Sequence, residues 1–242
     1  MRRHFEEQLA ECNSRLVHMG VAAQRMIDES IQCLLDRDVE GHERVFKQEE
    51  EMNGLHIEID ERVISALALQ QPVATDLRLL IMASKIAGEL ERIGDQAVNI
   101  CQNTASLLQH PAVEISTNMP AMADLVREML RESLEAFLGR DVELAQKVLH
   151  TDDKVDDFKD QVFFQLLGHM MSEPPAIPRA VALILISRSL ERVADHATNI
   201  AEEVIYAAQG RDVRHHREEE RRREGSAGGE AGIKAPQDPY LS

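Results

Sequence analysis

Tryptophan is absent from the sequence, aromatic residues make up only 3% of it, and no long apolar run occurs. The longest uninterrupted apolar run covers residues 180–186, whereas a membrane-spanning helix needs about 20 residues. Leu, Ile, Val, Ala and Met are abundant, and 29% of the residues are charged. This composition is typical of a helical bundle rather than a sheet protein, so we expect an all-α chain that does not span a membrane.

Positive charge is scarce. The formal net charge is −16 at pH 7 and the pI is about 5.0. So acidic a chain argues against DNA or RNA as the main ligand, because phosphate backbones attract basic surfaces. Cations or basic protein surfaces are the expected partners.

Cysteine is also scarce, and the three residues Cys12, Cys33 and Cys101 show no CxxC spacing. Such a set is typical of a reduced, cytoplasmic protein, and we expect each cysteine to act as a small buried hydrophobe. The N-terminal residues contain no apolar signal core. The expected location is therefore the cytoplasm.

The common catalytic motifs are missing. The chain contains no Glu-x-x-His, no His-Glu-x-x-His, no Gly-x-Ser-x-Gly and no glycine-rich phosphate loop. A ferritin-like di-iron oxidase needs Glu-x-x-His motifs that face the inside of a bundle. Catalysis is not supported by the sequence.

An internal repeat organises what is present. Residues 26–40 match 129–143 at an offset of 103, and residues 89–100 match 189–200 at an offset of 100. Both matches span whole helical segments, so the sequence indicates duplication of a helical unit. We expect two pseudo-symmetric three-helix bundles, comprising residues 1–110 and 118–209, followed by a charged, disordered tail at 210–242.

Prolines and capping residues divide each copy into three expected helices. Their approximate ranges are 5–35, 39–69 and 75–108 in the first copy, and 119–138, 142–170 and 177–208 in the second. The third helix of each copy has an unbroken apolar seam at steps of three and four residues, apart from Thr104. Leu80, Ile81, Val181 and Ile184 make the start of each third helix apolar nearly all round. Such a helix needs a cover, either the other copy, a second subunit or another protein.

The duplicated segments carry oxygen-bearing side chains at four-residue intervals. These are Glu91, Asp95 and Asn99 in the first copy and Glu191, Asp195 and Asn199 in the second. In a helix this spacing places the three side chains on one stripe. The stripe lies opposite the apolar seam and should face away from its own bundle core.

Further oxygen donors align on the second helix of each copy. They are Glu49 and Asn53 in the first copy and Asp152 and Asp156 in the second. Carboxylate and amide oxygens suit hard cations, and carboxylate-rich sites also take iron. We therefore expect metal at these residues, although a merely solvated acidic face remains the alternative.

The segments Leu-Glu-Arg-Ile-Gly-Asp-Gln-Ala-Val-Asn-Ile and Leu-Glu-Arg-Val-Ala-Asp-His-Ala-Thr-Asn-Ile, with Gln-Pro-Val-Ala-Thr-Asp-Leu-Arg at 71–78, closely resemble the PhoU family of phosphate-signalling proteins. The resemblance covers about residues 5–208. It implies two three-helix bundles, a homodimer, and metal clusters on surface carboxylates, with iron the expected metal and Mn, Mg, Zn or Ca as alternatives. The acidic motif of the family falls on Glu91, Asp95, Glu191 and Asp195. Gln96 stands where the family often has His, so equal occupancy of the two sites is in question.

The resemblance also implies a function. It suggests a negative regulator of the phosphate-starvation response that couples the ATPase subunit of the phosphate ABC transporter to the membrane sensor histidine kinase, reaching the membrane only through these partners. Two alternatives stay open. One is a metal-dependent enzyme acting on phosphorylated substrates, and the other is a metal-free helical scaffold.

Overall fold

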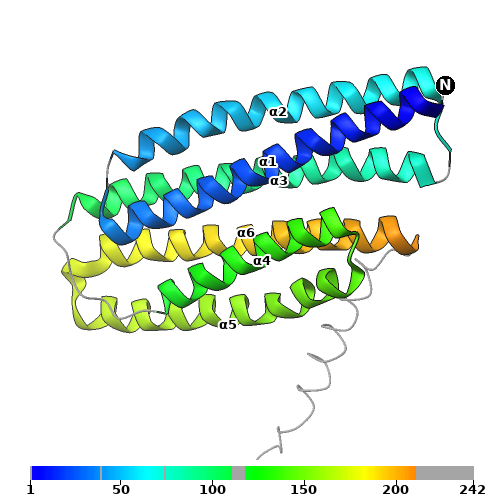
Figure 1. The fold of residues 1–242 in the computed structure, drawn as a ribbon. Helices are drawn as coiled ribbons and strands as arrows, with labels where there is room; N and C mark the ends of the chain where they lie inside the picture. Colours follow the sequence, from blue (N-terminus) through cyan, green and yellow to red (C-terminus); the bar gives the residue numbers. More distant parts are fainter. Residues whose placement is uncertain (1, 39, 74, 111–117, 211–242) are drawn as a thin grey trace, which may run out of the picture.

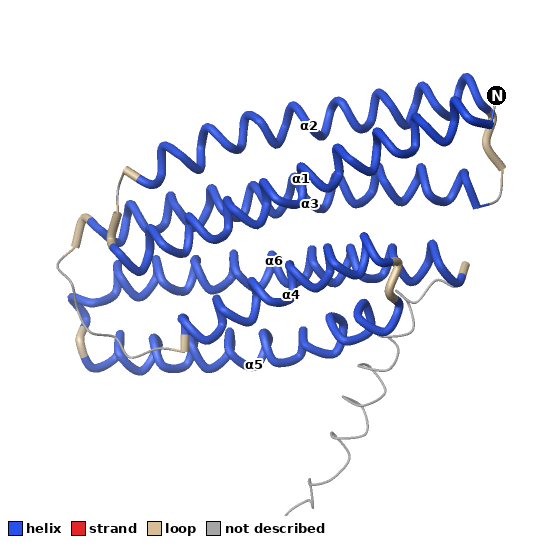
Figure 2. The backbone as a smooth tube through the Cα atoms, in the orientation of Figure 1, coloured by secondary structure: helices blue, strands red, loops and turns tan. Residues whose placement is uncertain are grey.

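Six long helices make up the protein. The computed structural model describes residues 2–38, 40–73, 75–110 and 118–210, so the predicted tail at 210–242 lies outside the described residues except for Gly210. The helices are α1 (Arg2–Asp36), α2 (Gly41–Gln70), α3 (Thr75–Leu108), α4 (Met119–Gly139), α5 (Val142–Ser172) and α6 (Ile177–Gln209), with a short 3-10 turn η1 (Pro174–Ala176) before α6. Figure 2 shows only helices and loops in the described part of the chain. The predicted all-α fold class is confirmed, and each helix end lies within three residues of its expected position.

Local backbone chemistry ends these helices. Arg37, Gln71 and Arg140 adopt left-handed conformations after α1, α2 and α4, with φ of 56°, 46° and 51°. A left-handed residue turns the chain out of the helix while its N–H bonds a carbonyl of the last turn. Asp141 begins α5, because its Oδ1 accepts bonds of 3.0 Å from the backbone N–H groups of Glu143 and Leu144.

The two copies lie side by side, joined through their third helices. In Figure 1, α2 and α5 form the outer edges of the molecule, while α3 and α6 lie next to each other between them. Helices α3 and α6 make the most extensive interhelical packing in the described chain, and a smaller contact joins α1 to α4. The apolar seams are the cores of the bundles, because Leu90, Ile93, Leu190 and Val193 are all fully buried.

Part of the apolar face predicted at the start of each third helix is buried within this chain. Leu80 is only 1% exposed and Ile184 is half-buried, whereas Ile81 and Val181 remain 38% and 43% exposed. Some apolar surface of this face therefore stays in solvent. None of the described helices combines the length and apolar character needed to span a bilayer.

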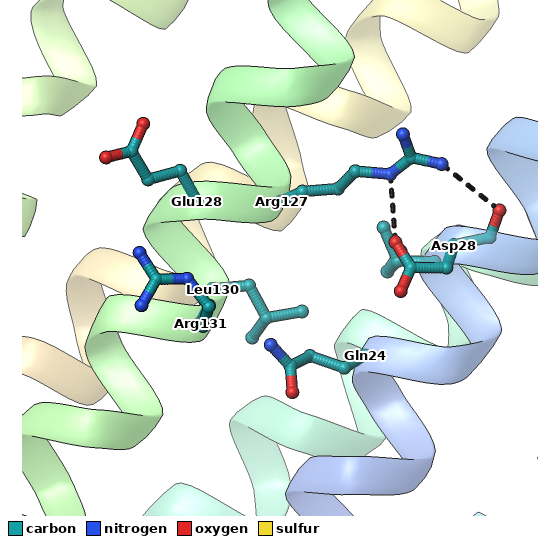
Figure 3. Close-up of a pocket in the computed structure, with 7 residues that line it drawn as sticks. Gln24, Asp28, Arg127, Glu128, Leu130 and Arg131 are labelled. Atoms are coloured by element: carbon teal, nitrogen blue, oxygen red, sulfur yellow. Dashed lines mark hydrogen bonds and ion pairs between the residues drawn. The ribbon is translucent and has the colours of Figure 1, made fainter.

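The contact between α1 and α4 has an apolar part, where Gly20 lies against Leu134, and a polar part. Figure 3 shows Arg127 of α4 reaching Asp28 of α1, with a 2.9 Å ion pair and a second bond of 3.3 Å to the Asp28 carbonyl. The pocket here, of about 330 Å³, is also lined by Glu128 and Arg131. Two arginines balance the acids, so this pocket lacks the excess negative charge that a cation site needs.

Candidate functional site

The acidic stripes lie on the long helices α3 and α6, in corresponding places. Asp95 and Asp195 are exposed, whereas Glu91 and Glu191 are half-buried. Each stripe lies on the opposite side of its helix from the buried seam, as its four-residue spacing predicts. Each acidic stripe is therefore open to solvent while its helix stays fixed by the core.

Acidic site one comprises Glu49 and Asn53 on α2 and Glu91, Asp95 and Asn99 on α3. Asn53 Nδ2 donates a 3.0 Å hydrogen bond to Glu49 Oε1. Desolvation and the negative charge of Glu49 raise the pKa of Asp95, although His196 of α6 opposes them. The α2 and α3 carboxylates are thus close enough to repel each other.

Acidic site two comprises Asp152 and Asp156 on α5 and Glu191, Asp195 and Asn199 on α6. Asp152 is only 8% exposed. Desolvation, followed by the negative charges of Glu191, Asp152 and Asp156, raises the pKa of Asp195 to about 6, although the side chain keeps contact with solvent. Four carboxylates gather here, and the ionised form of Asp195 is disfavoured because of it.

A lysine inside acidic site two went unnoticed in the sequence. Lys159 Nζ lies 2.8 Å from Asp156 Oδ1 and 3.1 Å from Glu191 Oε1, so it joins the two helices of the site. Desolvation opposes its charge, but the bonds to both carboxylates and their charges raise the pKa of Lys159. The counterpart at the offset of 103 is His56, whose Nε2 lies 3.6 Å from Asp60 Oδ2. Site one has three carboxylates, whereas site two has four carboxylates and one lysine. The two sites therefore have the same formal charge.

The two asparagines lie toward the junction between copies. Asn199 Nδ2 donates a 2.9 Å bond to Glu89 Oε2 on α3. Asn99 Nδ2 donates to Gln96 Oε1 at 3.3 Å, and Gln96 is 7% exposed. The amide nitrogens of Asn99 and Asn199 therefore bond to groups other than the stripe carboxylates.

Glu89 connects the two third helices and was not singled out from the sequence. Its Oε2 lies 2.8 Å from His196 Nδ1 on α6, and its Oε1 lies 2.6 Å from Arg92 Nη1. Desolvation opposes ionisation, but the bonds from His196 and Asn199 and the nearby positive charges lower the pKa of Glu89. The repeat hid this residue, because Ser189 stands at its counterpart position.

The donor set of the two sites suits a hard cation. Carboxylate and amide oxygens are the ligands preferred by Mg²⁺, Ca²⁺ and Mn²⁺, and carboxylate clusters also hold iron. Desolvation, followed by repulsion from neighbouring carboxylates, raises the pKa of Asp95 and of Asp195, and a bound cation would favour the ionised form of both. The residue types present therefore suit a divalent metal, although among the described residues no three carboxylates of either site bring ligand oxygens within 4.8 Å of one another.

Comparison with protein families gives one match, repeated. The model described as "PhoU domain" matches residues 16–104 and again 119–204. The two matched ranges correspond to the two copies of the internal repeat, and together they cover more than half of the chain.

Curated proteins give the same result. The chain is 36% identical over 214 residues to the phosphate-specific transport system accessory protein PhoU homolog of Pseudomonas putida, covering 88% of this chain and 84% of that protein. It is 35% identical to the homolog of Aquifex aeolicus, over 86% of this chain and 95% of that one. The Escherichia coli accessory protein PhoU is 29% identical over 87% and 88% of the two chains.

Solved structures agree on the fold. The crystal structure of PhoU from Pseudomonas aeruginosa superposes with a TM-score of 0.83 at 34% identity, covering 86% of this chain and all of that one. The phosphate transport system regulatory protein PhoU from Streptococcus pneumoniae gives a TM-score of 0.79 at 25% identity, covering 86% and 99%.

Proposed function

Because the chain belongs to the PhoU family, we propose that it is a non-enzymatic regulator of phosphate uptake and a negative regulator of the phosphate-starvation response. It couples the ATPase subunit of the phosphate ABC transporter to the sensor histidine kinase, as a homodimer at the cytoplasmic face of the membrane. The names of the relatives support the link to phosphate transport, since the curated ones are called accessory proteins of the phosphate-specific transport system.

The observation that supports a metal in this role is the pair of acidic sites. Glu49, Glu91 and Asp95 hold the cation in site one, and Asp152, Asp156, Glu191 and Asp195 hold it in site two, with the three asparagines Asn53, Asn99 and Asn199 as further oxygen donors. A bound divalent metal supplies positive charge that offsets the carboxylate repulsion and ties α2 to α3 and α5 to α6. Metal occupancy thereby fixes the two surfaces that partners meet.

Apolar surface supports docking. Large apolar side chains remain exposed where α5 turns into α6, including Phe164 at 67%, Met171 at 80% and Val181 at 43%. Exposed aromatic and Met side chains are favoured in binding surfaces. These exposed side chains, together with a net charge of −16, fit partners whose binding surface has apolar residues surrounded by basic ones.

The test is genetic and biochemical. A strain lacking the protein should express phosphate-starvation genes even when phosphate is abundant, and the wild-type gene should restore repression. Copies carrying Asp95→Asn with Asp195→Asn should restore it poorly, whereas the matched exposed control Asp157→Asn should restore it fully. In parallel, the wild-type protein should co-purify with the transporter ATPase and the kinase from membranes.

Two outcomes would contradict the proposal. Failure of the wild-type protein to associate with either partner would reject coupling. Metal-dependent turnover of a phosphoester by the pure protein, abolished by Asp195→Asn, would show instead that the protein is an enzyme.

A further inference from the structure

Three buried side chains with soft donor atoms meet at one end of the first bundle, away from the acidic sites. They are Cys33 of α1, His42 in the first turn of α2 and Cys101 of α3, which are 1%, 5% and 0% exposed. Their two sulfur atoms and one ring nitrogen all lie within 4.8 Å of one another. A cluster of this kind joins all three helices of the bundle.

The imidazole in this cluster has unused bonding capacity. His42 Nε2 is buried, and it has no hydrogen-bond partner among the residues that the structure describes. A buried polar atom without a partner costs about 1–3 kcal/mol, so native proteins rarely leave one in place. A ligand between the side chains would remove this cost.

The backbone beside the cluster is shaped around a cysteine sulfur. Gly41 begins α2, and a Cβ added there would collide with the Cys33 sulfur and would lie 3.0 Å from Asp38 Oδ2. Only glycine lets the first turn of α2 come this close to Cys33. The first turn of α2 therefore lies close to both the Cys33 sulfur and the Asp38 carboxylate.

The second bundle provides an internal control, because it has the same helices without the cluster. At the repeat offsets of 103 and 100, Cys33, His42 and Cys101 correspond to Ala136, Ala145 and Ala201. All three alanines are fully buried. Alanine thus satisfies the packing at these three positions, so packing alone gives no reason for two sulfurs and an imidazole in the first bundle.

We propose that Cys33, His42 and Cys101 form a binding site for a soft or borderline divalent cation, with Zn²⁺ as the best match. Thiolate and imidazole are the ligands that zinc prefers over Mg²⁺ or Ca²⁺. Tetrahedral zinc needs donor atoms about 3.5–4 Å apart, which small side-chain rotations provide from the present spacing. The carboxylate of Asp38 lies nearby, but it accepts bonds from Glu40 N–H and Arg44 Nη2, so a water completes the coordination.

The electrostatics of the cluster agree with a site that is uncharged without metal and stays electrically neutral when Zn²⁺ replaces two thiol protons. Burial raises the pKa of the Cys101 thiol to about 12 and also raises the pKa of Cys33. Burial lowers the pKa of His42, although Asp38 opposes the shift. The metal-free cluster therefore holds two neutral thiols and a neutral imidazole, and zinc takes the place of the thiol protons.

The site would stabilise the first bundle independently of the acidic sites. Zinc bound to the folded chain but not to the unfolded chain raises the melting temperature with metal concentration. Because the three ligands come from α1, α2 and α3, the metal would tie together the ends of all three helices. The second bundle relies on apolar packing alone at the same place.

Cobalt titration of the reduced, metal-free protein tests the proposal, because Co²⁺ bound to thiolate gives near-ultraviolet charge-transfer bands that oxygen ligands do not give. We expect these bands to reach saturation at one Co²⁺ per chain and to vanish when Zn²⁺ is added. Cys33→Ala and Cys101→Ala should each abolish them, and His42→Ala should weaken them. Cys12→Ala, which changes a buried cysteine outside the cluster, and Asp95→Asn with Asp195→Asn should leave them unchanged.

A second measurement keeps the result independent of folding. Alanine already occupies the three corresponding positions of the second bundle, so the variants should keep wild-type helicity by circular dichroism. Zn²⁺ should raise the melting temperature of wild type and of Cys12→Ala by more than that of the Cys33→Ala, Cys101→Ala double variant, in which only the acidic sites remain to bind it. Absence of thiolate bands in folded wild-type protein would overturn the proposal, as would a Cys33–Cys101 disulfide that forms equally well with Zn²⁺ present.

Discussion

The two halves of this protein share a helical framework and differ in the chemistry placed on it. The seams of α3 and α6 correspond residue by residue, with Leu90 and Leu190 fully buried in both. The acidic sites differ, because Lys159 lies inside one and its counterpart His56 bonds elsewhere in the other. The comparison teaches that the duplicated core fixes the helices, while a few substitutions decide the ion pairs and candidate ligands of each copy.

The junction between halves is also asymmetric. Glu89 on α3 binds His196 and Asn199 of α6, whereas the counterpart pair is Ser189 and Gln96. One half therefore supplies the carboxylate and the other the imidazole. The pseudo-symmetry of the backbone does not extend to this polar contact, so equivalent substitutions in the two copies should have unequal effects.

The largest effect should come from the paired core positions, where the halves are most alike. Leu90→Ala and Leu190→Ala each remove a fully buried side chain, and each should lower the free energy of unfolding by about 2–5 kcal/mol. Urea unfolding followed by circular dichroism measures both. Since α3 and α6 pack extensively, we expect one transition that both variants shift. Two transitions, each moved by only one variant, would show that the halves unfold independently.

Neutralising one aspartate at a time should show how much its ionisation destabilises the metal-free protein at each acidic site. The pKa of Asp195 is raised from 3.8 to about 6 in the folded protein, so its ionisation reduces stability progressively as pH rises from about 4 to about 6. A shift of this size corresponds to about 3 kcal/mol, which solvent screening at this exposed side chain reduces to about 1–2 kcal/mol. With chelator present, Asp195→Asn should therefore melt higher than wild type above pH 6, and equally near pH 4. Asp95→Asn should show the same trend, and an effect of opposite sign in either variant would contradict the repulsion inferred for that site.

The lysine of site two should compete with a bound cation. Lys159→Gln removes the ammonium that bridges Asp156 and Glu191, so the Mn²⁺ affinity of site two should rise about tenfold, or about 1.4 kcal/mol. His56→Gln at the counterpart position is the matched control and should change site one little. Isothermal titration of both variants measures this. Unchanged Mn²⁺ binding by Lys159→Gln would mean that the lysine moves aside without cost.

The smallest effect should come from making the junction symmetric. His196→Gln gives α6 the residue that α3 has at Gln96, and it removes the 2.8 Å bond to Glu89. We expect a loss of about 0.5–1.5 kcal/mol at neutral pH. The bond lowers the pKa of Glu89, so its contribution is present above the unfolded pKa and is lost as pH falls through the folded pKa. Equal destabilisation of the variant at all pH values would contradict this assignment.

The sequence was sufficient to predict the helices and the position of the stripes. Apolar steps of three and four, with the prolines at 72, 174 and 175, determine where helices run and break, because these signals are local. The pairing of Glu49 with the α3 stripe could also be predicted, since neighbouring helices of one copy must pack. These predictions depend only on properties within one repeat.

The contacts between repeats could not be predicted in the same way. Periodicity identifies the face toward a helix's own bundle, but it does not say that α3 packs on α6 or that Glu89 contacts His196. Lys159 could not be placed in site two from the sequence, because a lysine is no metal ligand of the oxygen-donor type and its counterpart His56 differs in chemistry. The cluster of Cys33, His42 and Cys101 had a signal in the sequence, because these three residues align with three alanines of the second copy. Cys33 and Cys101 are far apart in the sequence and show no CxxC spacing, so the cysteines taken one at a time predict only small buried side chains.

Manganese titration followed by electron paramagnetic resonance tests the central claim most directly, because bound Mn²⁺ loses the sharp signal of the free ion and thiolates do not favour this hard cation. We predict that the untagged wild-type protein binds Mn²⁺ in stoichiometric amount at two classes of site, that Asp95→Asn and Asp195→Asn each remove one class, and that Cys33→Ala with Cys101→Ala removes neither. No binding by the wild-type protein, or full binding by the variant with both aspartates replaced, would contradict the account.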